Sequence, residues 1–519
     1  MDMSQQMVII GAGLAGLSAA YTAARQGWQV WLCSSLPSER TQSVMAEGGI
    51  NAALDTQGQD DSPDQHEADT LRAACGLADP NAVQAMTTAA PALVEALADL
   101  GVPFNRTVDG QIDLRYFGGQ KKKRTAFSQS DTGKQLMTAL IDAVRRYEGE
   151  GGVRRLAHHD FLTLLHDGTT CTGVCLRDTW SGERCDLPAQ AVVIATGGLH
   201  GLFSCTTGSL ADTGAVTAEL FRLGLPVANG EFIQYHPTTI ASNGKRMLVS
   251  EAARGEGGRL WVLKQGRPWY FMEEKYPELG NLMPRDVTAR EIWYHCQAGE
   301  TVWLDLTGLD ESVFSRKLAG LVADCQLYGG VDIRRQPIAV SPGIHYFMGG
   351  LYVDEWHRTP WQHLYAAGEC ACQYHGANRL GGNSLLGAIY GGRKAACTAV
   401  EEGRERPLPR IVQVQLPPAA TSPVQLACLR QHLDQALGVV RTGAVLSQAL
   451  ERIKDLPGAL PLLGRALLQS ALGRQESRGA HWRSDFPRRD DDRFLKTTLA
   501  VYDGRQITLS YRPVPEKRG

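Results

Sequence analysis

Residues 7–33 read MVIIGAGLAGLSAAYTAARQGWQVWLC: an apolar run, a glycine turn, an alanine-rich stretch of helical character and a second apolar run. This order predicts a strand, a helix and a second strand. Gly11, Gly13 and Gly16 follow the spacing GxGxxG, where a tight turn, a close approach to a pyrophosphate and close helix–sheet packing leave no room for a Cβ. The flanking strand and helix favour a Rossmann-like domain that binds a dinucleotide over a glycine turn without a ligand.

The acidic residue that usually ends the second strand of such a unit is missing, and Ser34 and Ser35 stand there instead. We therefore expect hydroxyl or backbone groups to hold the ribose. Two later segments, AVVIATGG at 191–198 and HLYAAGEC at 363–370, are also apolar strands that run into glycine. Three such elements so far apart predict a parallel sheet that is interrupted by an inserted domain at about 231–345.

Other segments are read from their polarity. The acidic, turn-rich residues 55–68 predict a solvated loop. Amphipathic helices are expected at about 80–101 and 132–148, and again within 410–472, after a proline-containing linker and before a charged tail. The basic run at 121–124 is either a solvated loop or a contact with a partner.

Charge and hydropathy exclude several classes of protein. The 519 residues carry 53 Lys and Arg against 55 Asp and Glu, a formal charge of -2, which gives no field for holding nucleic acid. No stretch approaches the roughly 18 to 20 apolar residues of a membrane span, so we expect no direct membrane insertion. The N-terminus has no basic region followed by an apolar one, so no targeting segment is expected.

The twelve cysteines are scattered, and none has the CxxC spacing of zinc or iron–sulfur ligands. Reduced thiols in the cytoplasm are the simplest interpretation. The close pairs Cys370/Cys372 and Cys171/Cys175 leave open either buried thiols or a redox or metal role.

Four polar groups of residues stand in glycine-rich or aromatic settings. They are His236 in EFIQYHPTTI, Glu251 with Arg254 in SEAARGEGGR, Arg285 in MPRDVTARE, and His345 in PGIHYFMGG together with Arg379 in HGANRLGGNS. Guanidinium groups match carboxylates, and imidazoles and hydroxyls complete a clamp, so the set suits a small dianion. A metal is the rival use of the two histidines, but no carboxylate lies at ligand spacing from either. Taken singly, each residue is typical of a satisfied structural position.

These residues lie in motifs that carry a family resemblance over nearly the whole chain. The chain resembles the flavoprotein subunit of the succinate dehydrogenase and fumarate reductase family, within the superfamily of L-aspartate oxidase, and is most similar to the bacterial branch paired with menaquinone. The matching segments are GAGLAG, AEGGINAAL, RYFGGQKKKRTAFSQSDTGKQL, AVVIATGG, ANGEFIQYHPT, residues 250–258, KYPELGNLMPRDVTAREI, HYFMGGLYVD, AAGEC, HGANRLGGNSLL and ESRGAH.

The resemblance implies an α/β fold in three parts. These are a Rossmann-like FAD-binding domain of residues 1–230 and 346–409, an inserted α+β capping domain of residues 231–345, and a C-terminal helical domain and tail of residues 410–519. A four-carbon dicarboxylate, fumarate or succinate, would be held between the first two. An iron–sulfur partner subunit would relay electrons, and the cytoplasmic protein would be held at the inner face of the cell membrane through partner subunits.

The resemblance also assigns residues. Arg285 would deliver a proton as flavin N5 delivers hydride, and Glu251 with Arg254 would resupply that proton. His236, Ser250, His345 and Arg379 would bind the carboxylates, and Phe117 would lie against the substrate. The expected FAD-binding residues are Gly11, Gly13, Gly16, Ser34, Ser43, Gly48, Gly49, Thr196, Gly197, Glu369, Ser384 and Leu385.

Three departures from the family pattern matter. Many relatives attach FAD covalently through a histidine, but Gln42 stands at the matching place in RTQSVMAEGG, and an amide is not a nucleophile. We therefore expect non-covalent FAD, which favours fumarate reduction over succinate oxidation. The segment ADTGAV at 211–216 lacks an aspartate that some relatives place after the TG, which removes one expected hydrogen bond to FAD. The C-terminal helical region is shorter than in respiratory relatives, which weakens the case for iron–sulfur docking.

Two other functions remain open from the sequence. An L-aspartate oxidase would share the clamp and non-covalent FAD, but it places an acid near the substrate amine where this chain has the apolar FGGQ of residues 117–120. A partner-dependent assembly module with negligible turnover is the alternative from another class, with the basic run and the helical tail as docking surfaces.

Overall fold

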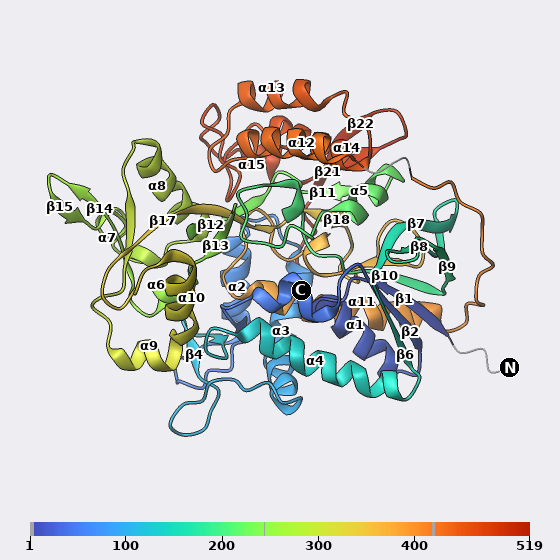
Figure 1. Cartoon of the computed structure of the whole chain (residues 1–519), viewed down its shortest axis with the longest axis horizontal. Helices are drawn as coiled ribbons and strands as arrows, with labels where there is room; N and C mark the ends of the chain where they lie inside the picture. The colour runs from blue at the N-terminus through green and yellow to red at the C-terminus, as the bar shows by residue number, and fades with distance from the viewer. Residues whose placement is uncertain (1–4, 243, 418–420, 519) are drawn as a thin grey trace.

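A parallel sheet lies at the centre of the larger unit of the computed structural model, which describes residues 5–242, 244–417 and 421–518 (Figure 1). Its strand order is β19-β10-β1-β2-β6, and every neighbouring pair is parallel. The strands are β1 (Gln6–Ile10), β2 (Gln29–Ser34), β6 (Val153–Ala157), β10 (Ala191–Ile194) and β19 (Leu364–Ala366). The three predicted strand-then-glycine segments are thus neighbours in one sheet, and the predicted interruption of the sheet is confirmed.

Helix α1 (Leu14–Arg25) follows β1 and packs against α11 (Asn383–Gly403) and α4 (Thr132–Gly149). Gly11 has a φ of 110°, a conformation that favours glycine. A Cβ on Gly16 would overlap the carbonyl oxygen of Gly11, so the third glycine allows the helix to approach its own strand. The other face of the sheet is covered by β7 (His159–Asp167), β8 (Thr170–Asp178) and β9 (Arg184–Pro188).

The inserted segment forms a six-stranded antiparallel sheet of order β13-β12-β17-β16-β14-β15. Its strands are β12 (Ile233–Ser242), β13 (Lys245–Leu248), β14 (Arg259–Lys264), β15 (Arg267–Trp269), β16 (Val302–Asp305) and β17 (Ile338–Phe347). Its helices are α6 (Ala252–Gly255), α7 (Phe271–Lys275), α8 (Arg285–Gln297), α9 (Glu311–Lys317) and α10 (Ala319–Gly329). Figure 1 shows this unit at one side of the molecule, in yellow and green.

The C-terminal part begins with three helices, α12 (Pro423–Ala436), α13 (Gly443–Ile453) and α14 (Ala459–Gly473), which share an apolar core. The charged segment that follows, expected to be a tail, contains two paired strands. Strands β21 (Lys496–Tyr502) and β22 (Ile507–Pro513) form a hairpin that joins β11 (Val227–Ala228) in a second sheet. The sequence analysis placed no strands there. The hairpin is only partly buried, and β22 forms its more exposed strand.

Two expectations about polar segments are wrong. Helix α2 (Pro63–Ala73) begins within the predicted loop at 55–68, with Ser62 as its N-cap. The basic run at 121–124 is also not simply a solvated loop or a partner contact. Arg124 has no solvent-exposed side-chain surface, and its Nη2 lies 2.9 Å from Asp61 Oδ1 and 2.9 Å from Asp69 Oδ2. Lys121 does face solvent and pairs with Glu278 at 2.7 Å.

Further elements complete the fold. Helix α3 (Pro80–Asp99) and α4 match the amphipathic helices predicted at about 80–101 and 132–148. The smaller elements are η1 (Ser38–Arg40), η2 (Gln42–Met45), β3 (Ile50–Asn51), β4 (Leu114–Arg115), β5 (Thr125–Ala126), η3 (His200–Leu202), α5 (Ala215–Arg222), η4 (Gly280–Leu282), β18 (Gly350–Tyr352), η5 (Gly368–Cys370), β20 (Ala371–Cys372) and α15 (Asp491–Phe494). Across the described ranges, no helix has the length and apolar character that a membrane crossing requires.

The buried ion pairs of Arg124 give a test of the fold. Arg124→Ala leaves two carboxylates facing an apolar interior, so we expect the free energy of unfolding to fall by about 3–5 kcal/mol. Lys121→Ala removes an exposed pair from the same basic run and is expected to cost about 0–1 kcal/mol. Urea-induced unfolding followed by circular dichroism measures both. Equal effects of the two substitutions would contradict the burial of Arg124.

Candidate active site

One cavity of about 1170 Å³ runs from the glycine turn after β1 to the junction with the capping sheet. The predicted residues that line it are Gly11, Gly13, Ser34, Ser43, Gly48, Gly49, Phe117, Thr196, Gly197, His236, Ser250, Glu251, Arg285, His345, Glu369, Arg379, Ser384 and Leu385. Gly16 and Arg254 do not line it. Gly16 lies beneath the turn, against the backbone of Gly11, and Arg254 reaches the cavity only through its ion pair with Glu251.

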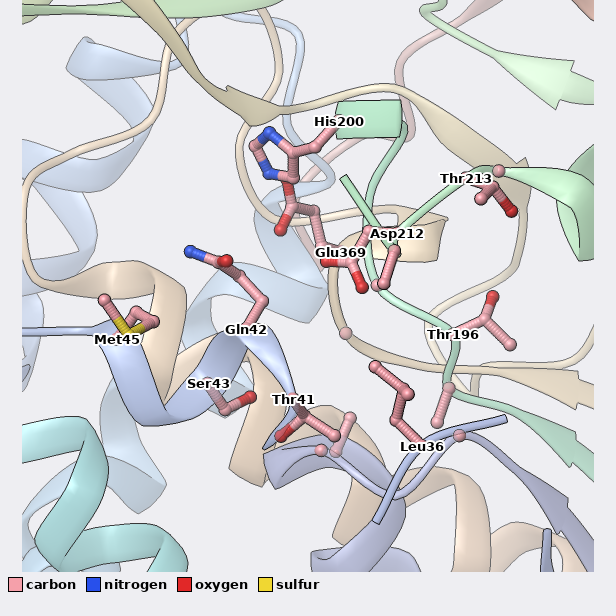
Figure 2. A pocket seen from close by; sticks show the side chains of 18 of the residues that line it. Leu36, Thr41, Gln42, Ser43, Met45, Thr196, His200, Asp212, Thr213 and Glu369 are labelled. Carbon is pink, nitrogen blue, oxygen red and sulfur yellow. The ribbon is translucent and has the colours of Figure 1, made fainter. Parts of the chain in front are cut away.

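The cavity fits a long dinucleotide along its length. The N-terminus of α1 opens into it, and the backbone N–H of Leu14 donates to Ser43 Oγ at 3.2 Å. Next to Ser43 in η2, Gln42 Oε1 accepts from the backbone N–H of Ser209 at 2.7 Å. Figure 2 shows Gln42 and Ser43 facing His200 and Glu369 across the space. A glycine turn, a helix N-terminus and polar side chains on both walls are what a bound pyrophosphate and its ribose units need.

Asp212 and His200 are site residues that the sequence analysis missed. Asp212 lies against Gly197, and burial raises its pKa to about 7 although His200 opposes the rise. His200 Nε2 lies 3.5 Å from Glu369 Oε1, and the same carboxyl oxygen accepts from the backbone N–H of Phe347 at 2.9 Å. Asp212 is the aspartate that stands before the TG in ADTGAV, and it lines the cavity. The signal in the sequence was its place in that motif.

Glu251 joins two arginines in the capping unit. Its Oε2 accepts from Arg285 Nη2 at 2.7 Å and from Arg285 Nε at 3.0 Å, while its Oε1 accepts from Arg254 Nη2 at 2.8 Å. Burial alone would raise the pKa of Glu251, but Arg285 and Arg254 outweigh it and hold that pKa well below the ordinary value of 4.5. Arg285 Nη1 also donates to Gln234 Oε1 at 3.0 Å. The guanidinium of Arg285 is thus fixed on two sides.

The two histidines and Arg379 gather on the same wall. The rings of His236 and His345 meet edge to face with centroids 5.0 Å apart. His236 Nε2 and the Nε and Nη2 atoms of Arg379 are buried, with no hydrogen-bond partner among the described residues. Such groups are costly to bury unless a ligand satisfies them. Three donors or acceptors left open beside a cavity therefore indicate that an anionic or polar ligand completes the site.

Charge in this wall is arranged for an anion. Burial, and next the positive charge of Arg285, lower the pKa of both His236 and His345 well below 6.5, so both rings are neutral at pH 7. Burial, and next Arg285, lower the pKa of Arg379 to about 9. The wall therefore holds the guanidiniums of Arg285 and Arg379 and the carboxylate of Glu251, with the guanidinium of Arg254 behind it. A dianion would offset the excess of positive charge.

The thiols and the histidines give no sign of a metal centre. All twelve cysteines lie within the described ranges and are free. Burial raises the pKa of Cys370 to about 11 and that of Cys171 to about 12, as expected for inert core thiols. In the described part of the chain, no three His, Cys, Asp or Glu side chains gather in the way that a metal site requires.

Comparison with known proteins agrees with this geometry. Residues 6–385 match the model of the FAD binding domain, and residues 458–518 match that of the fumarate reductase flavoprotein C-term. The chain is 38% identical to the succinate dehydrogenase flavoprotein subunit of Bacillus subtilis, over 96% of this chain and 94% of that protein. The chain belongs to the succinate dehydrogenase and fumarate reductase flavoprotein family. It is an FAD-dependent oxidoreductase of the three-part α/β fold that the sequence predicted.

Other members of this flavoprotein family extend the comparison. The chain is 37% identical to the L-aspartate oxidase of Mesorhizobium japonicum, over 98% of each protein. Among solved structures, Escherichia coli quinol fumarate reductase gives a TM-score of 0.87 at 28% identity over 98% of this chain and 97% of that one. A quinol–fumarate reductase with menaquinol gives 0.88 at 28% identity over 99% of both chains. Relatives with two different activities thus share the fold, so the substrate must be argued from the site.

The central carboxylate of the flavoprotein site gives a prediction on pH. Glu251→Gln leaves two guanidiniums without a buried counter-charge, so we expect the free energy of unfolding at pH 7 to fall by about 3–5 kcal/mol. Because the folded-state pKa is depressed, this stabilisation is present above pH 4.5 and is lost as the pH falls below it. Urea denaturation from pH 3.5 to 7 measures the difference between wild type and variant, which should shrink on acidification.

A matched substitution in the same unit serves as the control. Glu273 pairs with Arg259 at 2.6 Å on the surface of the capping unit, with both side chains more than a third exposed. Glu273→Gln should therefore cost about 0–1 kcal/mol at any of these pH values. A pH-independent difference between wild type and Glu251→Gln would show that Glu251 is not the ionised centre of this network.

Proposed function

We propose that this flavoprotein reduces fumarate to succinate. The observation that carries the proposal is the wall on which His236, His345, Arg285 and Arg379 face one cavity with unsatisfied polar atoms. The spacing of guanidiniums and imidazoles around a small volume suits the two carboxylates of a four-carbon diacid. Ser250 and Phe117, which line the same cavity, would contribute a hydroxyl and an apolar ring to that pocket.

In this proposal bound FAD supplies a hydride to one carbon of the double bond. His236, His345 and Arg379 hold the carboxylates. Arg379 draws electron density away from the double bond, so that the alkene can accept the hydride. This stabilisation grows toward the transition state. Arg285 gives its proton to the other carbon. A free guanidinium is a poor acid, with a pKa above about 12, but the carbanion-like carbon is far more basic. Glu251, 2.7 Å from Arg285 and 2.8 Å from Arg254, would return the proton.

The two electrons must be supplied from outside this chain. The names of several relatives call them flavoprotein subunits, which supports an iron–sulfur partner as the source. In this proposal the flavoprotein lies in the cytoplasm, at the inner face of the cell membrane, where partner subunits hold it. The C-terminal helical region is expected to be shorter than in respiratory relatives. Docking of the iron–sulfur subunit would therefore differ most at this region.

L-aspartate oxidase is the second candidate, because relatives of that name match nearly the whole chain. Phe117 argues against it. The ring is buried, lines the cavity and begins the segment 117–120, in which an L-aspartate oxidase would place an acid for the substrate amine. An ammonium group there would face the guanidiniums of Arg285 and Arg379, and residues 117–120 supply no carboxylate to offset its charge.

An anaerobic experiment separates the two activities. We reduce the protein-bound flavin with dithionite and expect fumarate to restore its absorbance within the time of mixing. Arg285→Lys keeps the charge beside Glu251 but moves the donor, so we expect a rate lower by about 10²–10⁴-fold. Arg259→Lys, on the exposed surface of the same unit, is the control. Failure of fumarate to reoxidise the wild-type flavin, with rapid hydrogen peroxide production from L-aspartate in air, would establish the oxidase instead.

The amide of Gln42 predicts that FAD is held without a covalent bond. Gln42 faces the cavity, and its side-chain oxygen is already bonded to the Ser209 backbone. After acid precipitation, the yellow colour should therefore remain in the supernatant. A succinate dehydrogenase with covalent flavin, treated in parallel, should carry its colour in the pellet. Colour that stays with the precipitate of this protein would refute the prediction.

A further inference from the structure

Glu47 is a carboxyl group in the active-site cavity that none of the assigned roles uses. It follows η2 and precedes Gly48, and its backbone is held tightly. Its carbonyl oxygen accepts from Arg115 Nη2 at 3.2 Å and from Thr132 Oγ1 at 3.3 Å, and the carbonyl of Gly48 accepts from Arg115 Nε at 3.1 Å. The side chain therefore leaves a fixed point in the cavity wall.

That point lies beside the proposed dicarboxylate pocket. A Cβ on Gly48 would stand 2.8 Å from the ring of Phe117, so this segment packs directly on the aromatic wall of the pocket. Glu47 lines the same cavity as Ser250. Its Oε2 atom is out of contact with solvent and has no hydrogen-bond partner in residues 5–242, 244–417 and 421–518. A free carboxyl oxygen on a residue whose backbone is held in place is thus available to a ligand.

The charges around Glu47 come from several elements. Asp324 on α10 and Asp131, the residue before α4, are the acidic neighbours; Arg115 on β4 is the basic one, and Cys325 lies close by. Burial first, and then Asp324, raise the pKa of Glu47 to about 8, although Arg115 and the Ser250 hydroxyl oppose the rise. Glu47 is accordingly a neutral carboxylic acid at pH 7 and carries a proton that it can donate in a hydrogen bond.

We propose that Glu47 binds one carboxylate of the dicarboxylate substrate as a neutral hydrogen-bond donor, and that its ionisation blocks substrate binding. The inference rests on the proposed function and adds a residue that sets its working pH range. A protonated Glu47 offers a donor to the substrate beside Ser250. An ionised Glu47 would place a third negative charge next to a dianion in a poorly solvated site, which costs far more there than in water.

The sign of the pH effect follows. Below pH 8 Glu47 is protonated and the dicarboxylate binds. Above pH 8, each further pH unit lowers the fraction of protein with a protonated Glu47 about tenfold. His236 and His345 do not interfere, because their pKa values lie well below 6.5. Arg379, with its pKa lowered to about 9, is the other group whose titration would weaken binding, but at a higher pH.

Malonate, a dicarboxylate that cannot accept a hydride, is the probe. Its dissociation constant is measured on the FAD-loaded protein from the change in flavin absorbance between pH 6 and pH 9.5. For the wild type we expect the constant to rise about tenfold per pH unit above pH 8. Glu47→Gln keeps a donor without a titrating proton, so its constant should stay flat until the range of Arg379.

Asp324→Asn, on α10, is a second variant, which changes the charge beside Glu47 and leaves Glu47 itself in place. Asp324 raises the pKa of Glu47, so its neutralisation should move the onset of weaker binding to lower pH, opposite to the effect of Glu47→Gln. Infrared difference spectra after a pH jump give a readout without any ligand. The wild type should lose the carbonyl stretch of a protonated carboxyl near pH 8, and Glu47→Gln should lack this band while both proteins keep the change that Asp212 gives near pH 7.

Each outcome bears on one claim. An identical alkaline rise in wild type and Glu47→Gln, or binding by the wild type that does not change up to pH 9, overturns the role of Glu47 and leaves the proposed function intact. If neither protein binds malonate at any pH and fumarate does not reoxidise the flavin, the proposed function fails, and this inference fails with it.

Discussion

The buried contact between Glu251 and two arginines is the constraint on which the active site depends. Three ionised groups with almost no exposed surface are tolerable only because each oxygen of the carboxylate accepts from a guanidinium. The other domain leaves the room for this group. A Cβ on Gly118 would overlap Glu251 Oε1, and one on Gly381 would stand 2.7 Å from Glu251 Oε2. The close packing of the two units around Glu251 therefore also fixes the position of Arg285.

The distribution of its charged and polar groups makes the site suited to an anion. Two neutral imidazoles and a guanidinium with open N–H groups face the cavity, while the one strongly ionised carboxylate turns both oxygens toward arginines. The wall is thus positive without exposing mobile charges, and little reorganisation is needed when a dianion binds. Farther along the cavity, Asp212, His200 and Glu369 form a separate acidic group against the glycine turns.

The same principle explains why several sequence predictions about charged segments failed. Arg124 stands in a run of four basic residues and looked like a surface residue, yet it is buried against Asp61 and Asp69. Arg474 likewise donates to Glu231, which lies 243 residues away in the chain, and to Glu476, which lies just beyond the end of α14. Charge runs predict solvation because an isolated charge is costly to bury, but a partner from a distant segment cancels that cost. Such partners cannot be read from local sequence.

Local sequence determined the parallel sheet, the glycine turn and the amphipathic helices, because each depends on residues within one or two elements: the missing Cβ at Gly11 and Gly16, and the apolar runs at 7–10, 191–194 and 364–366. The motifs also named the residues that gather in the cavity. Tertiary structure alone decided the roles that need a distant neighbour. Asp212 and Glu47 became perturbed carboxyls, and β21 and β22 joined β11, only through contacts made across the fold. Propensity is local, whereas desolvation and charge pairing are properties of the assembled interior.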